Sequence, residues 1–181
     1  MHGGKPEEAC ELAKLPKNRT EGSGTTEQQD AAAVRVFPPG IPLLTILIGI
    51  GLNHLWPIDL ELPKIARYLL GGIIIIGAFF CLGLWSVVLF RRSGQSENPW
   101  KPTPQLVDRG PFRITRNPMY LQMILICVGV AVILGNVWML VVTPFGAWVL
   151  QRFAILPEEA YLERKFGAQY LAYKHRVRRW L

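Results

Sequence analysis

The sequence predicts an all-α integral membrane protein with four transmembrane helices and a C-terminal amphipathic helix at the membrane interface. Three observations carry this prediction. Half of the 181 residues are hydrophobic, and only 18% are charged. The apolar residues gather in long stretches with almost no charge, which is typical of membrane spans. Basic residues gather between these stretches on alternate sides, as the positive-inside rule requires.

The N-terminal residues 1–36 are polar, with charges of both signs and many Gly, Ser and Thr residues. They lack the basic head, apolar centre and cleavage site of a secretory signal. A segment of this composition buries too little apolar surface to fold alone. We therefore expect a disordered tail at 1–36 and a membrane domain at 37–181.

Four spans are expected at about residues 41–56, 68–90, 118–134 and 137–155. The first is short, because its 16 residues reach only about 24 Å as a helix. It must therefore tilt little or thin the bilayer locally. The second holds small residues that let neighbouring helices approach closely. These are Gly71, Gly72, Gly77 and Gly83.

The last two spans are separated by the turn-forming dipeptide Gly135-Asn136. Such a short connection predicts a tight antiparallel hairpin. Pro144 lies within the fourth span and is expected to kink it or to mark an irregular turn.

The count of basic residues predicts the topology. Residues 1–40 carry five Lys or Arg, 57–67 carry two, 91–116 carry six, 135–136 carry none and 152–181 carry seven. Four spans then place both termini and the 91–116 segment in the cytoplasm. The predicted localisation is thus a multi-pass membrane protein.

The cytoplasmic start of the third span and the cytoplasmic end of the fourth are expected to meet, because spans three and four form a hairpin. The first carries Arg116, Asn117, Pro118, Met119 and Tyr120, and the second carries Pro157, Glu158 and Glu159. Asn before Pro, and Pro before two acids, are both ordinary helix starts. Acids at this depth also need a cationic partner, which Arg116, Arg152 or a ligand cation supplies. The meeting point is therefore a candidate pocket.

The segment after Ala160 predicts a basic amphipathic helix at the interface, interrupted at Gly167. Its apolar face carries Leu162, Phe166, Tyr170, Tyr173 and Val177.

The net charge is +7. The basic residues flank apolar spans instead of forming one patch with aromatic residues, which favours anionic lipid headgroups over nucleic acid as partners. Cys10, Cys81 and Cys127 are read as free thiols, since no pair has metal-ligand spacing. Neither a metal nor a nucleic acid is expected.

The segments LVDRGPFRITRNPMYL and PEEAYLERKFGAQYLAYKHRVRRWL, separated by a membrane hairpin, together resemble the isoprenylcysteine carboxyl methyltransferase family. The related phospholipid N-methyltransferases share this pattern. The resemblance covers about residues 91–181. It implies an enzyme that uses S-adenosylmethionine, with a pocket built from 91–120 and 152–181.

The resemblance also implies which residues hold the cofactor. They are Pro104, Gln105, Leu106, Val107, Phe112, Asn117, Pro118, Met119, Tyr120 and Glu158. Eukaryotic members place an arginine that contacts the substrate where this chain has Ala154, so Arg152 is expected to take its place. Arg152 and Glu159 are therefore the predicted substrate contacts, and no catalytic residue is assigned.

The expected methyl acceptor is lipophilic and reaches the pocket from the bilayer. It is a prenylcysteine-type carboxylate, a phospholipid amine, or a small apolar acid or thiol. A carboxylate or thiolate needs no base, whereas an amine must lose a proton. Two other functions fit the same sequence. One is a membrane reductase that binds NADPH, and the other is a membrane protein without catalysis whose acids and arginines only cap helices.

Overall fold

The computed structural model describes residues 36–94 and 105–181. The elements in chain order are α2 (Gly40–Leu55), α3 (Lys64–Gly77), the π-helical turn η2 (Ala78–Leu84), α4 (Trp85–Arg92), the 3₁₀ turn η3 (Gly110–Arg113), α5 (Pro118–Leu134), α6 (Val137–Leu150), the π-helical turn η4 (Gln151–Ile155), α7 (Leu156–Phe166) and α8 (Ala168–Arg176). The described residues contain no strand beyond isolated bridges, so the all-α prediction is confirmed for them. Residues 1–35 of the predicted tail lie outside them.

Two continuous helices are long and apolar enough to cross a membrane. α3, η2 and α4 together form Lys64–Arg92 with 29 residues, and α6, η4 and α7 form Val137–Phe166 with 30 residues. α2 and α5 are apolar but have only 16 and 17 residues. A helical span needs about 20 residues. Crossing of the membrane by α2 and α5 therefore stays a prediction.

The fourth predicted span is longer than expected, because the helix continues beyond residue 155 to Phe166. A proline inside an α-helix removes one hydrogen bond, and its ring presses on the carbonyl four residues earlier. The π-helical turn η4 lies just before Pro157. Its wider turn accommodates the proline without ending the helix. The helix also continues past Pro144.

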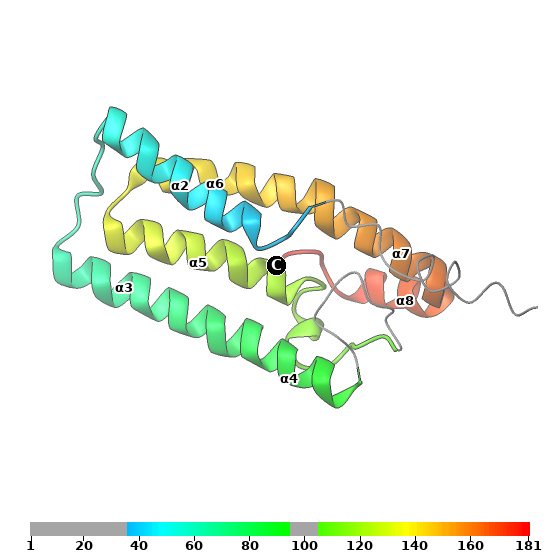
Figure 1. The fold of residues 1–181 in the computed structure, drawn as a ribbon. Coiled ribbons are helices and arrows are strands. Elements are labelled where there is room, and N and C mark those ends of the chain that lie inside the picture. Colours follow the sequence, from blue (N-terminus) through cyan, green and yellow to red (C-terminus); the bar gives the residue numbers. More distant parts are fainter. Residues whose placement is uncertain (1–35, 95–104) are drawn as a thin grey trace, which may run out of the picture.

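α5 is the central helix, with α3 packed on one side and α2 and α6 on the other (Figure 1). A Cβ on Gly71 would lie 2.6 Å from the Gly129 carbonyl oxygen, and a Cβ on Gly83 would collide with the Gln122 side chain. Gly72 and Gly77 have nothing within 4 Å. The predicted close approach of a neighbouring helix is thus confirmed at Gly71 and Gly83. At Gly72 and Gly77 the prediction is wrong.

The predicted hairpin between α5 and α6 is present. Gly135 adopts the left-handed conformation, with φ of 68°, that glycine tolerates without strain. The Asn136 side chain then caps α6 by accepting a hydrogen bond of 2.9 Å from the Met139 amide. This turn places the far ends of the two helices, where the site residues lie, side by side.

The outer surface of the helices is apolar. Only 17% of the most apolar stretch of Lys64–Arg92 is buried inside the protein, and 33% of that of Val137–Phe166. Large side chains such as Ile73, Phe80 and Phe145 are exposed. A soluble monomer rarely exposes so large an apolar surface. The arrangement therefore supports association with a membrane.

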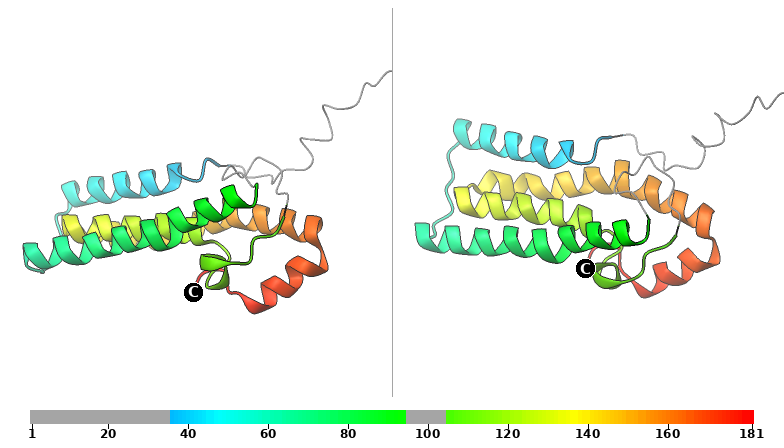
Figure 2. Two further views of the ribbon diagram at one scale, coloured as in Figure 1. Left: turned by 90° about the horizontal axis from the view of Figure 1, so that it is seen from below. Right: turned by 60° about the horizontal axis from the view of Figure 1, so that its bottom comes forward.

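The last segment of the chain folds back on the protein. α7 ends at Gly167, whose φ is 50°, and α8 returns toward η3 and the start of α5 (Figure 2). The predicted break at Gly167 is thus confirmed. Tyr170, Tyr173 and Val177 form a buried cluster, against which Leu106 and Phe166 pack. The apolar face expected to meet lipid therefore packs against the protein, because loop 105–117 offers it an apolar partner.

Candidate functional site

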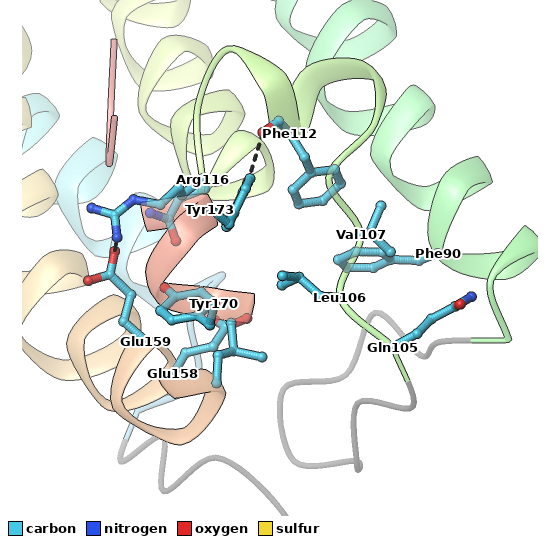
Figure 3. A pocket seen from close by; sticks show the side chains of 12 residues that line it. Phe90, Gln105, Leu106, Val107, Phe112, Arg116, Glu158, Glu159, Tyr170 and Tyr173 are labelled. Atoms are coloured by element: carbon cyan, nitrogen blue, oxygen red, sulfur yellow. Dashed lines mark hydrogen bonds and ion pairs between the residues drawn. The ribbon is translucent and has the colours of Figure 1, made fainter. Parts of the chain in front are cut away.

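A pocket lies at the end of the bundle where the start of α5 meets α7. Its empty space, counted together with the open solvent at its entrance, is about 470 Å³. Its walls come from α4, the segment before η3, η3 itself, the residues just before α5, α7 and α8 (Figure 3). The lining residues are Phe90, Gln105, Leu106, Val107, Phe112, Arg116, Asn117, Glu158, Glu159, Leu162, Tyr170 and Tyr173. The expected meeting of residues 116–120 with Glu158 and Glu159 is thus observed, but the expected helix start at Pro157 is wrong, because the helix runs without a break from Val137 to Phe166.

One wall of the pocket is apolar. The rings of Phe90 and Phe112 stack with centroids 5.2 Å apart. The Tyr173 hydroxyl donates a hydrogen bond of 2.8 Å to the Phe112 carbonyl oxygen, which ties α8 to η3. Leu106 packs against the buried cluster of Tyr170, Tyr173 and Val177. This wall can hold flat or aliphatic ligand groups.

The opposite wall carries the acids of α7. The Tyr120 hydroxyl donates a hydrogen bond of 2.8 Å to Glu158 Oε2. Tyr120 comes from the first turn of α5, so this contact joins α5 to α7. A single neutral donor leaves the Glu158 carboxylate with acceptor capacity for a ligand.

Glu159 is only 5% exposed and lies between two arginines. Arg179 binds it through both carboxylate oxygens, with Nε 3.1 Å from Oε1 and Nη2 2.8 Å from Oε2. Arg116 Nη1 lies 3.3 Å from Oε1. The hydrogen bond with Glu159 raises the pKa of Arg179, so its guanidinium stays charged.

Arg116 keeps unused donors beside the pocket. Its side chain is 9% exposed. Within the described part of the chain, its Nε and Nη1 have no hydrogen-bond partner. The 3.3 Å approach of Nη1 to Glu159 is an ion-pair contact outside hydrogen-bond geometry. Burying a donor without a partner is energetically unfavourable. This guanidinium can therefore donate hydrogen bonds to an anionic ligand group.

The C-terminal tail holds the segment that carries Arg116. The Arg116 amide donates to the Arg178 carbonyl oxygen at 2.9 Å. The Thr115 hydroxyl and the Asn117 side-chain amide both donate to the Arg179 carbonyl oxygen, at 2.9 and 3.1 Å. The Trp180 indole donates to Gln151 in η4 at 2.8 Å. The tail is therefore a structural part of the site.

The two tyrosines of α8 remain neutral phenols near neutral pH. Burial, reinforced by the nearby Glu159 carboxylate, raises the pKa of Tyr170 to about 12. Burial also raises the pKa of Tyr173. Both side chains therefore line the pocket as neutral phenols.

The structure brings most of the predicted cofactor residues together. Gln105, Leu106, Val107, Phe112, Asn117 and Glu158 line the pocket. Tyr120 reaches it only through Glu158, while Pro118 and Met119 follow in the first turn of α5 without lining it. Pro104 lies outside the described residues. Contact of these residues with a cofactor stays a prediction.

The two predicted substrate residues lie in different settings. Glu159 lines the pocket, with its carboxylate engaged by arginines. Arg152 is exposed on η4 and is not among the lining residues. In the described residues, Cys81 and Cys127 are free thiols, and no group of metal-ligating side chains comes together.

The sequence did not single out Phe90, Leu162, Tyr170, Tyr173 or Arg179 as site residues. Helical spacing placed Leu162 and the two tyrosines on one face of the tail, and that face also suits a pocket wall. No local pattern marks Phe90, which lies near the end of α4, or Arg179. Only the return of the chain along residues 115–117 brings Arg179 to Glu159.

An apolar helical protein with a polar pocket at one end of its bundle is the class that the fold and the site define. The sequence matches the phospholipid methyltransferase family over residues 65–169. This match includes α3 to α7, with Arg116 and both acids. The chain belongs to this family of membrane methyltransferases.

An uncharacterized protein of Haemophilus influenzae is 45% identical over 65 residues, which are 35% of this chain and all of that protein. No solved structure matches the chain. The predicted relationship to membrane methyltransferases is confirmed at the level of the family. The match does not distinguish the isoprenylcysteine branch from other members of the family.

Proposed function

We propose that the protein transfers a methyl group from S-adenosylmethionine to a lipid-like acceptor at the membrane surface. One observation carries the proposal. Both Arg116, a guanidinium with two unpaired buried nitrogens, and Glu158, a carboxylate with unused acceptor capacity, line the pocket. This pair complements a zwitterion, which is the form of the amino-acid part of S-adenosylmethionine at neutral pH.

The remainder of the pocket also suits this cofactor. The aromatic rings of Phe90, Phe112 and Tyr170 offer faces to a purine or a sulfonium. Among the described residues, the lining holds one cation and two acids, a balance that disfavours the phosphates of NADPH. This argues against the alternative of a reductase.

The residues of this chain have distinct roles in the proposal. Glu158 binds the ammonium group, and Arg116 binds the carboxylate. The cofactor supplies an electrophilic methyl group on a sulfonium. The aromatic wall excludes water and fixes orientation, because holding two reactants in line removes much of the entropic barrier.

A phospholipid is the first candidate for the acceptor, supported by the family match. A prenylcysteine-type carboxylate is the second, supported by the state of Glu159. An amine acceptor needs a base, and Glu159 is the acid of the pocket beside Glu158. Its carboxylate is instead engaged by Arg116 and Arg179, which weakens it as a base. A carboxylate acceptor needs no base.

The proposed topology has four spans, with both termini and the pocket in the cytoplasm. It is supported by the distribution of Lys and Arg along the chain. The pocket lies at the end of the bundle that carries the basic segments, where a cytosolic cofactor has access.

Calorimetric titration of the detergent-solubilised protein tests the cofactor. We expect S-adenosylhomocysteine to bind and NADPH not to bind, because the pocket suits a zwitterion better than a polyphosphate. Binding of NADPH alone would instead support a reductase. Binding of neither compound would support a protein without catalysis.

Transfer of a radiolabelled methyl group to a membrane lipid extract tests the acceptor. With a phospholipid amine, the label should remain non-volatile after alkaline treatment, because the methyl group is bound to nitrogen. A methyl ester should release volatile labelled methanol on alkaline treatment. Incubation without the protein is the control, and an absence of lipid labelling would contradict a lipid acceptor.

A further inference from the structure

Arg116 and Arg179 share the single carboxylate of Glu159, and they share it unequally. Arg179 makes two hydrogen bonds to it, at 2.8 and 3.1 Å. Arg116 makes one ion-pair contact at 3.3 Å and keeps two nitrogens without hydrogen bonds. The planar fork of a guanidinium matches a carboxylate in this bidentate way. Arg179 therefore engages both carboxylate oxygens of Glu159, whereas Arg116 approaches only one of them.

We propose that Arg179 is a positioning residue, which neutralises Glu159 and so leaves Arg116 free for the carboxylate of the cofactor. This inference rests on the proposed function. Without Arg179, the buried Glu159 would have only Arg116 as a partner for its charge. Arg116 would turn to Glu159 and would be lost to the ligand.

The backbone contacts keep Arg179 in place. Thr115, Arg116 and Asn117 all bond to carbonyl oxygens of residues 178 and 179, on either side of the Arg116 side chain. The distance between the two arginines is therefore set by hydrogen bonds to the main-chain carbonyl groups of residues 178 and 179. A change of the Arg179 side chain leaves these contacts possible, because they use only its backbone.

A pair of ligands separates positioning from a general effect on the fold. S-adenosylhomocysteine carries the amino-acid carboxylate, whereas 5′-methylthioadenosine has the same nucleoside and thioether without it. We expect R179A to weaken S-adenosylhomocysteine binding by roughly tenfold to a hundredfold, the usual effect of losing a charged hydrogen bond. Binding of 5′-methylthioadenosine should change by less than about threefold, which corresponds to under 1 kcal/mol.

Three further variants complete the experiment on the full chain in detergent. R178A removes the same charge from an exposed neighbouring side chain and should leave both affinities unchanged. E159Q added to R179A removes the charge that captures Arg116, so the double variant should recover most of the lost S-adenosylhomocysteine affinity. R179K keeps the charge without the fork and should cause a smaller loss. It also provides the comparison if R179A does not fold.

The outcomes separate the two levels of the proposal. If the unmodified protein binds neither ligand, the proposed function fails, and the inference fails with it. If both ligands bind but R179A lowers both affinities equally or neither, only the positioning role is overturned. A double variant no better than R179A would also overturn it, since a purely structural loss is not repaired by E159Q.

Discussion

Replacement of Glu158 by glutamine is expected to weaken the binding of S-adenosylhomocysteine by roughly tenfold to a hundredfold, because a hydrogen bond to a charged group contributes about 1.5–3 kcal/mol. Glutamine has the shape of glutamate, and its carbonyl oxygen can still accept the hydrogen bond from Tyr120. The substitution therefore removes the negative charge while keeping the contact between α5 and α7. Isothermal titration in detergent measures the change.

The matched control for this variant is Glu163→Gln on the same helix. Glu163 pairs with Lys174 at 3.0 Å, and its side chain is 41% exposed. Exposed ion pairs contribute at most about 1 kcal/mol. We expect the control to bind S-adenosylhomocysteine like the unmodified protein. Equal affinities for E158Q and E163Q, with both variants folded, would remove Glu158 from the site.

The sequence predicted the centre of the site because two simple signals agreed. The Gly135-Asn136 turn required α5 and α6 to be antiparallel neighbours, which brings Tyr120 close to Glu158. The cost of an acid near the membrane required a partner, and Arg116 supplies it for Glu159. Both signals act over short stretches of chain, so they can be read without tertiary structure.

The features that the sequence missed depend on distant contacts. The apolar face of α8 fits lipid and protein equally well in its pattern of residues. Only the presence of Leu106 and Phe112 beside it decides in favour of the protein. Arg179 likewise looks like one more interfacial cation until residues 115–117 bind its backbone. Hydrophobic periodicity identifies a buried face but not what covers it.

The π-helical turns could not be predicted from the sequence, for a different reason. Each inserts a wide turn into a helix whose residues are all acceptable in an α-helix. At η4, Pro157 gave a signal, which we read as a helix start rather than as a position inside a continuing helix. The wide turn also carries Gln151, which accepts the hydrogen bond from Trp180 and so anchors the tail that holds Arg179.

Replacement of Gly71 by alanine is expected to destabilise the protein by about 1–3 kcal/mol, the usual cost of overpacking a tight contact. The added Cβ would lie 2.5 Å from Ile133 Cγ1 and 2.6 Å from the Gly129 carbonyl oxygen. The Ile133 side chain can rotate away, but the carbonyl belongs to the backbone of α5. α3 and α5 must therefore move apart, and many contacts along their length weaken together.

The neighbouring Gly72 provides the control, because a Cβ there meets nothing within 4 Å. Both substitutions gain the same preference of alanine for a helix, about 1 kcal/mol. G72A should therefore be as stable as the unmodified protein or more stable, whereas G71A should unfold at a lower temperature. Thermal unfolding in detergent, followed by circular dichroism, measures the difference. Equal melting temperatures would mean that α3 and α5 do not meet at Gly71 in the folded protein.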